Sequence, residues 1–169
     1  NRVHRLFANA CREDSTIFPV ATRIDLSDSK ITECVRALQS MSLTRTDVDS
    51  VGSAFEQFFG TVFRGDLGQY FTRRELARFT VAILEPTHDD FVMDPTAGSG
   101  GFLLEALLQV WHGIDRQFSG QYQQDRLQID FALHRVFGIE IHRVLARICK
   151  INLLLHHDGH TNIEGIRSC

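Results

Sequence analysis

An acidic residue and three closely spaced glycines stand near the middle of the chain, in a pattern that could bind a ligand. Asp94 closes the short apolar run 91–93, and Gly98, Gly100 and Gly101 follow before an uninterrupted series of helix formers. The run is too short for a helix, so the pattern predicts a strand, a tight turn and a helix. The glycines would let the backbone approach a ligand closely, and the first N–H groups of the helix would face it. The spacing therefore predicts a binding site for a small charged molecule.

A second acid, Glu140, lies in the next strand-like run, 136–141, and helps to decide which molecule binds. A dinucleotide-binding sequence would have a third glycine where this chain has Leu103, and its second acid would follow after roughly 20 residues. Two carboxylates at neighbouring strand tips can accept hydrogen bonds from an ammonium group and a ribose diol, while the helix N-terminus takes a carboxylate. S-adenosyl-L-methionine presents all three groups, so we expect it as the cofactor. An ordinary strand-to-helix turn is the alternative, although such a turn seldom needs so many glycines.

The segment 68–84 precedes this site and adds a second candidate contact region. Thr72 and Glu75 have the spacing of a capping box, which predicts a helix capped by Thr72. This helix should bury three apolar residues, Leu76, Phe79 and Ile83. Three residues on the approach to it could present an aromatic ring and backbone N–H groups to a ligand: Gln69, Tyr70 and Phe71. A capping box alone would also explain Thr72 and Glu75, so a purely structural role remains the alternative.

Four segments resemble the cofactor motifs of the adenine-specific N6 DNA methyltransferases, and in particular of the methylation (M) subunit of type I restriction-modification systems. They are residues 68–76, 94–103, 137–141 and 151–160, in the order of the family. The resemblance covers the chain from Val51 to Ile163. It implies an α/β protein with the Rossmann-like class I S-adenosylmethionine-dependent methyltransferase fold. We expect three layers, incomplete at the C-terminal edge and preceded by a helical segment.

Carried over position by position, the resemblance implies a pocket in which Glu140 holds the ribose hydroxyls and residues 69–72 line the methionine end of the cofactor. The expected cofactor-binding residues are Gln69, Tyr70, Phe71, Thr72, Asp94, Thr96, Ala97, Gly98, Ser99, Gly100, Gly101 and Glu140. Two positions depart from the family: Arg73 stands where proline is usual, and His142 where an acid is frequent. Arginine should make the start of the helix less rigid than proline would.

The family's catalytic motif is absent from the sequence. Family members hold the flipped adenine with a later Asn-Pro-Pro-aromatic tetrapeptide, whereas the prolines of this chain, Pro19, Pro86 and Pro95, stand in other contexts. We therefore expect no catalytic residue here, no methyl transfer by these residues alone, and a fragment of a longer methyltransferase. The alternatives are a methyltransferase acting on another acceptor, since cofactor motifs do not define the acceptor, and a non-catalytic cofactor-binding or assembly module.

Composition limits the partners. The formal net charge of −3 provides no basic surface for tight binding to a phosphate backbone, so DNA affinity must come from elsewhere in an assembly. The resemblance implies a DNA substrate, a specificity subunit and possible contact with a restriction subunit. Four scattered cysteines without a Cys-x-x-Cys pair favour a reduced, cytoplasmic protein. No apolar run reaches membrane-spanning length and no signal peptide is recognisable, so we expect no membrane contact.

The chain divides into two predicted parts, a helical N-terminal segment, 1–65, and the truncated cofactor-binding part of a methyltransferase domain, 66–169. Within the first part, apolar periodicity predicts helices at the N-terminus, after Ser27, and from Thr46 to Gly65, the last with a phenylalanine-rich face. The resemblance suggests that this segment docks other parts of an assembly.

Two further patterns have ordinary structural explanations. His156 and His160 could bind zinc, but Gly159 lies between them and histidines near a helix C-terminus are favourable as cations, so we expect no metal. The aromatic residues Trp111, Phe118 and Tyr122 could stack on bases, but we expect them to pack against the protein instead.

Overall fold

The computed structural model describes residues 2–42, 54, 57, 72–156 and 159–165 of the 169-residue chain. Its contacts separate two units, Asn1–Val51 and Gly52–Cys169. The expected boundary after residue 65 and nearly all of the expected phenylalanine-rich helix lie outside the described residues, so both stay predictions. Among the residues described, no helix is both long and apolar enough to cross a membrane.

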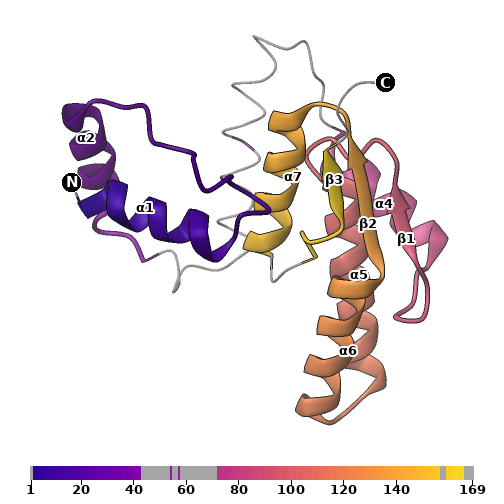
Figure 1. Cartoon of the computed structure of the whole chain (residues 1–169). Helices are drawn as coiled ribbons and strands as arrows, with labels where there is room; N and C mark the ends of the chain where they lie inside the picture. Colours follow the sequence, from indigo (N-terminus) through magenta and orange to yellow (C-terminus); the bar gives the residue numbers. More distant parts are fainter. Residues whose placement is uncertain (1, 43–53, 55–56, 58–71, 157–158, 166–169) are drawn as a thin grey trace. The chain divides into compact units, whose positions relative to one another are not determined.

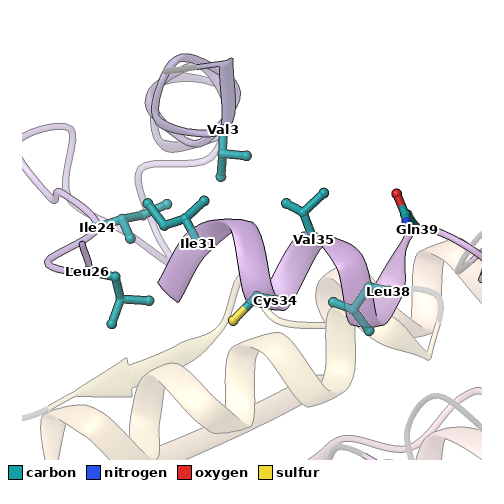
Figure 2. Close-up of a pocket in the computed structure, with 8 residues that line it drawn as sticks. All are labelled: Val3, Ile24, Leu26, Ile31, Cys34, Val35, Leu38 and Gln39. Carbon is teal, nitrogen blue, oxygen red and sulfur yellow. The ribbon is translucent and has the colours of Figure 1, made fainter. Parts of the chain in front are cut away.

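The described part of the first unit, residues 2–42, forms the two helices that the sequence predicts there. They are α1 (Arg2–Glu13) and α2 (Asp28–Leu38), and Ser27 caps α2 by accepting a hydrogen bond from the backbone N–H of Lys30. An open apolar groove of about 390 Å³ lies along α2 (Figure 2). Ile31 is buried beside it, whereas Val35 and Leu38 remain about half exposed.

The second unit contains a parallel three-stranded sheet in the order β1-β2-β3 (Figure 1). The strands are β1 (Val92–Asp94), β2 (Val136–Glu140) and β3 (Ile163–Gly165). Asp94 pairs with Gly138, so Glu140 extends two residues beyond the tip of β1. The carboxyl ends of parallel strands meet at one edge, which places Asp94 and Glu140 at the same edge, as expected.

The helices between the strands pack on the sheet around one apolar core. α5 (Gly101–Gln117) and α6 (Gln121–His134) connect β1 to β2, and α7 (Arg143–Leu155) connects β2 to β3. One buried cluster includes residues of all three helices and of the sheet, among them Leu107, Phe131, Val136, Leu153 and Ile163. Because α5 and α7 share this cluster, they lie on the same face of the sheet. The alternation of parallel strands and helices confirms the α/β class.

The helix before β1, α4 (Arg74–Leu84), begins one residue later than the capping box predicts. Arg73, not Thr72, is the N-cap, and its extended backbone (φ −61°, ψ 137°) is not accompanied by a side-chain cap. The Arg73 carbonyl accepts the first hydrogen bonds of the helix, from Leu76 and Ala77. Glu75 therefore becomes the second helical residue, where its carboxylate pairs with Arg73 at 3.4 Å instead of closing a capping box. Its own backbone N–H, and next the charge of Arg73, lower the pKa of Glu75.

The buried face of α4 also differs from the prediction. Ala77 and Val81 are buried, whereas the three residues expected in the core, Leu76, Phe79 and Ile83, are 55%, 63% and 66% exposed. The reason is the packing of α4 on α5, which uses the face that also carries Arg74 and Arg78. Periodicity identified an apolar stripe but could not show which stripe the neighbouring helix would cover.

Gly138 of β2 is expected to tolerate no larger side chain. A Cβ atom there would lie 2.8 Å from the Cδ1 atoms of both Leu103 and Ile163. Such overpacking should lower the free energy of unfolding of Gly138→Ala by about 1–3 kcal/mol. Gly113→Ala is the matched control, because its Cβ in α5 would meet no neighbouring element within 4 Å, and it should raise stability by roughly 0.5–1 kcal/mol. Urea unfolding measures both effects, and wild-type stability of Gly138→Ala would contradict this packing.

Candidate functional site

The loop between β1 and α5 has the backbone geometry that its glycines suggest. Gly98 and Gly100 have φ angles of +56° and +87°, in the left-handed region that residues with a Cβ rarely adopt. Gly100 is the N-cap of α5, and a Cβ atom on it would lie 2.8 Å from Sγ of Cys149. Gly101 has no such constraint, since a Cβ there would meet nothing within 4 Å. Two of the three glycines are therefore required by the turn itself.

Glu140 joins this loop to the tip of β2. Its side chain is buried, and its Oε2 accepts a hydrogen bond from the Gly98 N–H at 2.9 Å. Its Oε1 accepts one from the His142 N–H at 2.7 Å, just before α7 begins. Each carboxylate oxygen has two lone pairs, so both could also accept from ligand hydroxyls. Glu140 thus orders the loop, a role that the sequence did not reveal.

Asp94 organises the first turn of the loop. Its Oδ1 accepts hydrogen bonds from the Thr96 backbone N–H at 2.9 Å and from the Thr96 hydroxyl at 3.4 Å. The Ala97 N–H then donates to the Ile139 carbonyl at 2.9 Å, which holds the loop against β2. Asp94 and Thr96 therefore shape the loop next to Glu140.

Two residues of α7 contact the glycine loop, and neither was identified from the sequence. The Asn152 side chain is fully buried and donates a hydrogen bond to the Ser99 carbonyl at 3.1 Å. Cys149 lies one turn earlier, against Gly100. Burial, and next the negative charges of Asp94 and Glu140, raise the pKa of the Cys149 thiol to about 12, so it stays protonated. The signal in the sequence was a polar residue on the apolar face of a helix, three positions after a cysteine.

The contacts between α4 and α5 advance in the same direction along both helices, so their N-termini lie toward the same end. The Arg74 guanidinium, at the start of α4, pairs with Glu105 at 2.9 Å, and further along Gln109 donates to the Val81 carbonyl at 3.3 Å. Thr72, just before α4, is exposed at the end of the helix pair that carries the glycine loop. Gln69, Tyr70 and Phe71 lie outside the described residues, so their place in the site stays a prediction.

The aromatic residues in the last turns of α5 and just after it mostly pack, as expected. Trp111 and Phe118 are partly buried against the core, and the Trp111 indole donates to the Gln128 carbonyl at 3.3 Å. The Phe118 ring meets His88 edge-on at 5.5 Å. Tyr122 differs, because its side chain is 82% exposed.

His156 is buried just after α7. Its Nδ1 forms a hydrogen bond with the Asn152 carbonyl at 2.8 Å, which is a structural contact.

The chain combines a strand that ends in an acid, a left-handed glycine turn at a helix N-terminus and a second acid on the adjacent parallel strand. These features are typical of α/β domains that bind nucleotide-like ligands. Comparison with known proteins identifies the family within this class. The family model described as N-6 DNA Methylase matches residues 46–168, and the chain belongs to this family.

Individual relatives agree with this assignment. The chain is 26% identical over 156 residues to the type II restriction enzyme and methyltransferase RM.BcgI of Heyndrickxia coagulans, covering 90% of this chain and 23% of that protein. It is 37% identical over 103 residues to the type I restriction enzyme EcoKI methylase subunit of Escherichia coli K12, covering 58% of this chain and 17% of that protein. The chain thus corresponds to less than a quarter of the length of either relative.

A solved structure has a similar fold. It is the modification subunit of a putative type I restriction enzyme from Vibrio vulnificus YJ016, with a TM-score of 0.55 and 26% sequence identity. The similarity covers 72% of this chain and 25% of that one. Together with the relatives, this structure confirms the resemblance to type I methylation subunits and the α/β methyltransferase fold.

Proposed function

We propose that this chain is the cofactor-binding part of an adenine-N6 DNA methyltransferase that uses S-adenosyl-L-methionine. Membership of the N-6 DNA methylase family supports the reaction class. The observation that carries the proposal is the left-handed turn at Gly98 and Gly100, hydrogen-bonded to Glu140 and next to Asp94. This combination brings backbone N–H groups, a helix N-terminus and two carboxylates to one edge of the sheet.

The residues present fit the chemical groups of S-adenosyl-L-methionine, which supplies an activated methyl group on a sulfonium. Glu140 would accept hydrogen bonds from the ribose hydroxyls, since its oxygens retain lone pairs beside their backbone partners. Asp94 would take the ammonium group, and the N–H groups at the start of α5 would take the carboxylate. The backbone from Thr96 to Gly101 would line the cofactor, and residues 69–72 would face its methionine end.

The wider assembly is also part of the proposal. The relatives are named as restriction enzymes and methylase subunits, which supports a DNA substrate, a specificity subunit and contact with a restriction subunit. The formal charge of −3 means that these partners would supply most of the affinity for DNA. The described cysteines Cys11, Cys34 and Cys149 are free thiols, which supports a cytoplasmic location.

Substitution of Glu140 tests the cofactor site. In Glu140→Gln an amide NH₂ replaces one acceptor oxygen and the charge is lost, so the affinity for S-adenosyl-L-methionine should fall by ~1.5–3 kcal/mol. Isothermal titration calorimetry measures it. Glu164→Gln is the matched control, because Glu164 lies on the neighbouring strand β3 with an exposed side chain, and its affinity should equal that of the wild type. Unchanged binding in Glu140→Gln would remove this residue from the site.

A further inference from the structure

A buried carboxylate outside the proposed cofactor contacts connects α4 to α5, the helix that follows the glycine loop. Glu105 lies four residues into α5 after Gly101, and its side chain is only 6% exposed. A carboxylate in such a position is costly unless charged partners compensate it. Glu105 has two of them, because its Oε1 accepts from Arg74 Nε at 2.9 Å and its Oε2 from Arg78 Nε at 3.3 Å.

Both arginines belong to α4 and lie one helical turn apart, so each carboxylate oxygen holds one of them. This arrangement fixes both the rotation of α4 about its axis and its position along α5. Ala77 and Val81, the buried residues of α4, have small or smooth side chains that would pack in several alternative registers. Charged groups that pair with defined geometry are the interactions that select one register.

The position of this ion-pair cluster gives it a functional consequence. Arg74 is the first residue of α4, and Glu105 lies one turn after the glycine loop, so the cluster joins the start of α4 to the start of α5. Other described ion pairs differ in this respect. Lys30–Glu33 and Arg73–Glu75 are local and exposed, and Asp130–Arg135 lies where α6 ends.

We propose that Glu105 is a positioning residue that sets the distance between the start of α4 and the glycine loop, and thereby shapes the methionine end of the cofactor pocket. This inference rests on the proposed function. Glu105 does not touch the cofactor, and it acts through Arg74 and Arg78. The adenosine end of the pocket, built by Glu140 and the tip of β2, does not depend on α4.

The test compares two ligands in the full chain by calorimetry. S-adenosyl-L-methionine occupies both ends of the pocket, whereas 5′-methylthioadenosine has the adenine, ribose and sulfur but lacks the amino-acid group. Glu105→Gln keeps the side-chain shape and removes the charge. It should weaken binding of S-adenosyl-L-methionine by about tenfold and binding of 5′-methylthioadenosine by less than about twofold. Glu140→Gln should weaken both.

Matched variants separate positioning from general stability. Asp130→Asn removes a carboxylate from the ion pair with Arg135, 3.6 Å apart and remote from the loop, and should change neither affinity. Glu105→Asp keeps the charge but shortens the side chain, so it should show the same ligand selectivity to a smaller degree. Thermal melts without ligand show whether Glu105→Gln is folded. If it is not, Glu105→Asp still tests the proposal.

The possible results are distinct. An equal loss for both ligands would assign Glu105 a merely structural role and overturn the proposal, as would unchanged affinity for S-adenosyl-L-methionine. Failure of the wild-type chain to bind either ligand would instead refute the proposed function, and this inference with it. A selective loss for the ligand that carries the amino-acid group would establish Glu105 as a positioning residue.

Discussion

Gly100→Ala is expected to eliminate measurable binding of S-adenosyl-L-methionine. The φ angle of +87° at this position is unfavourable for any L-residue with a Cβ, at a cost of roughly 1–3 kcal/mol. The new methyl group would also lie 2.8 Å from Sγ of the fully buried Cys149, closer than two such atoms can approach. The start of α5 must therefore shift, and with it the backbone N–H groups that are proposed to face the cofactor.

Two neighbouring substitutions calibrate this result in the same calorimetric titration. Gly101→Ala should bind like the wild type, because a Cβ there meets nothing within 4 Å and the φ angle is ordinary. Gly98→Ala should be intermediate, since its φ of +56° is unfavourable while the nearest atom to the new Cβ lies 3.9 Å away. Adding Cys149→Ala to Gly100→Ala should restore thermal stability in part, because it removes the clash but not the backbone strain. Normal binding by Gly100→Ala would show that the loop is an ordinary turn.

The 169-residue chain by itself is expected to give only background methylation of DNA. Transfer to an adenine amine requires the base to be flipped out and held near the methyl group, and such placement can account for ~7–11 kcal/mol of a barrier. No Asn-Pro-Pro-aromatic sequence occurs between Asn1 and Cys169. A methylation assay with labelled cofactor and an adenine-rich duplex measures the activity directly.

The matched positive experiment supplies what the chain lacks. Fusing it to the following segment of a family member that carries the tetrapeptide, and adding a specificity subunit, should produce signal above background. The same fusion with Gly100→Ala should remain silent, which ties the activity to the proposed cofactor site. Turnover by the chain alone would place an acceptor site within these residues. The exposed Tyr122 and its neighbours after α5 would then be the first region to test.

Local sequence was sufficient for the elements that carry the site. The run ending at Asp94, the glycines after it and the helix formers that follow each have one dominant backbone preference, and β1, the left-handed turn and α5 occur where these preferences indicate. Glu140 was identifiable because an acid that ends an apolar strand is exceptional. The parallel pairing of β1 with β2 then follows, because the helices between the two strands form a crossover connection.

The contacts between elements were not accessible in this way. The start of α4 at Arg74 and the exposure of Leu76, Phe79 and Ile83 depend on which face of this helix meets α5. Propensity describes a helix alone and does not encode its partner. The same is true of the site residues that were missed, because the contact of Asn152 with Ser99 and of Glu105 with Arg74 joins positions 53 and 31 residues apart.

The sequence by itself therefore determined the family motifs, the order of the elements and the chemical groups at the strand tips, since these follow from local backbone preferences and residue identity. Only the tertiary structure decided how those groups are held. Glu140 is bound by two backbone N–H groups, Gly100 is pressed against Cys149, and Glu105 is clamped between two arginines. Apart from the local contact with the His142 N–H, each of these contacts joins groups from different elements, and close packing in three dimensions is what brings them together.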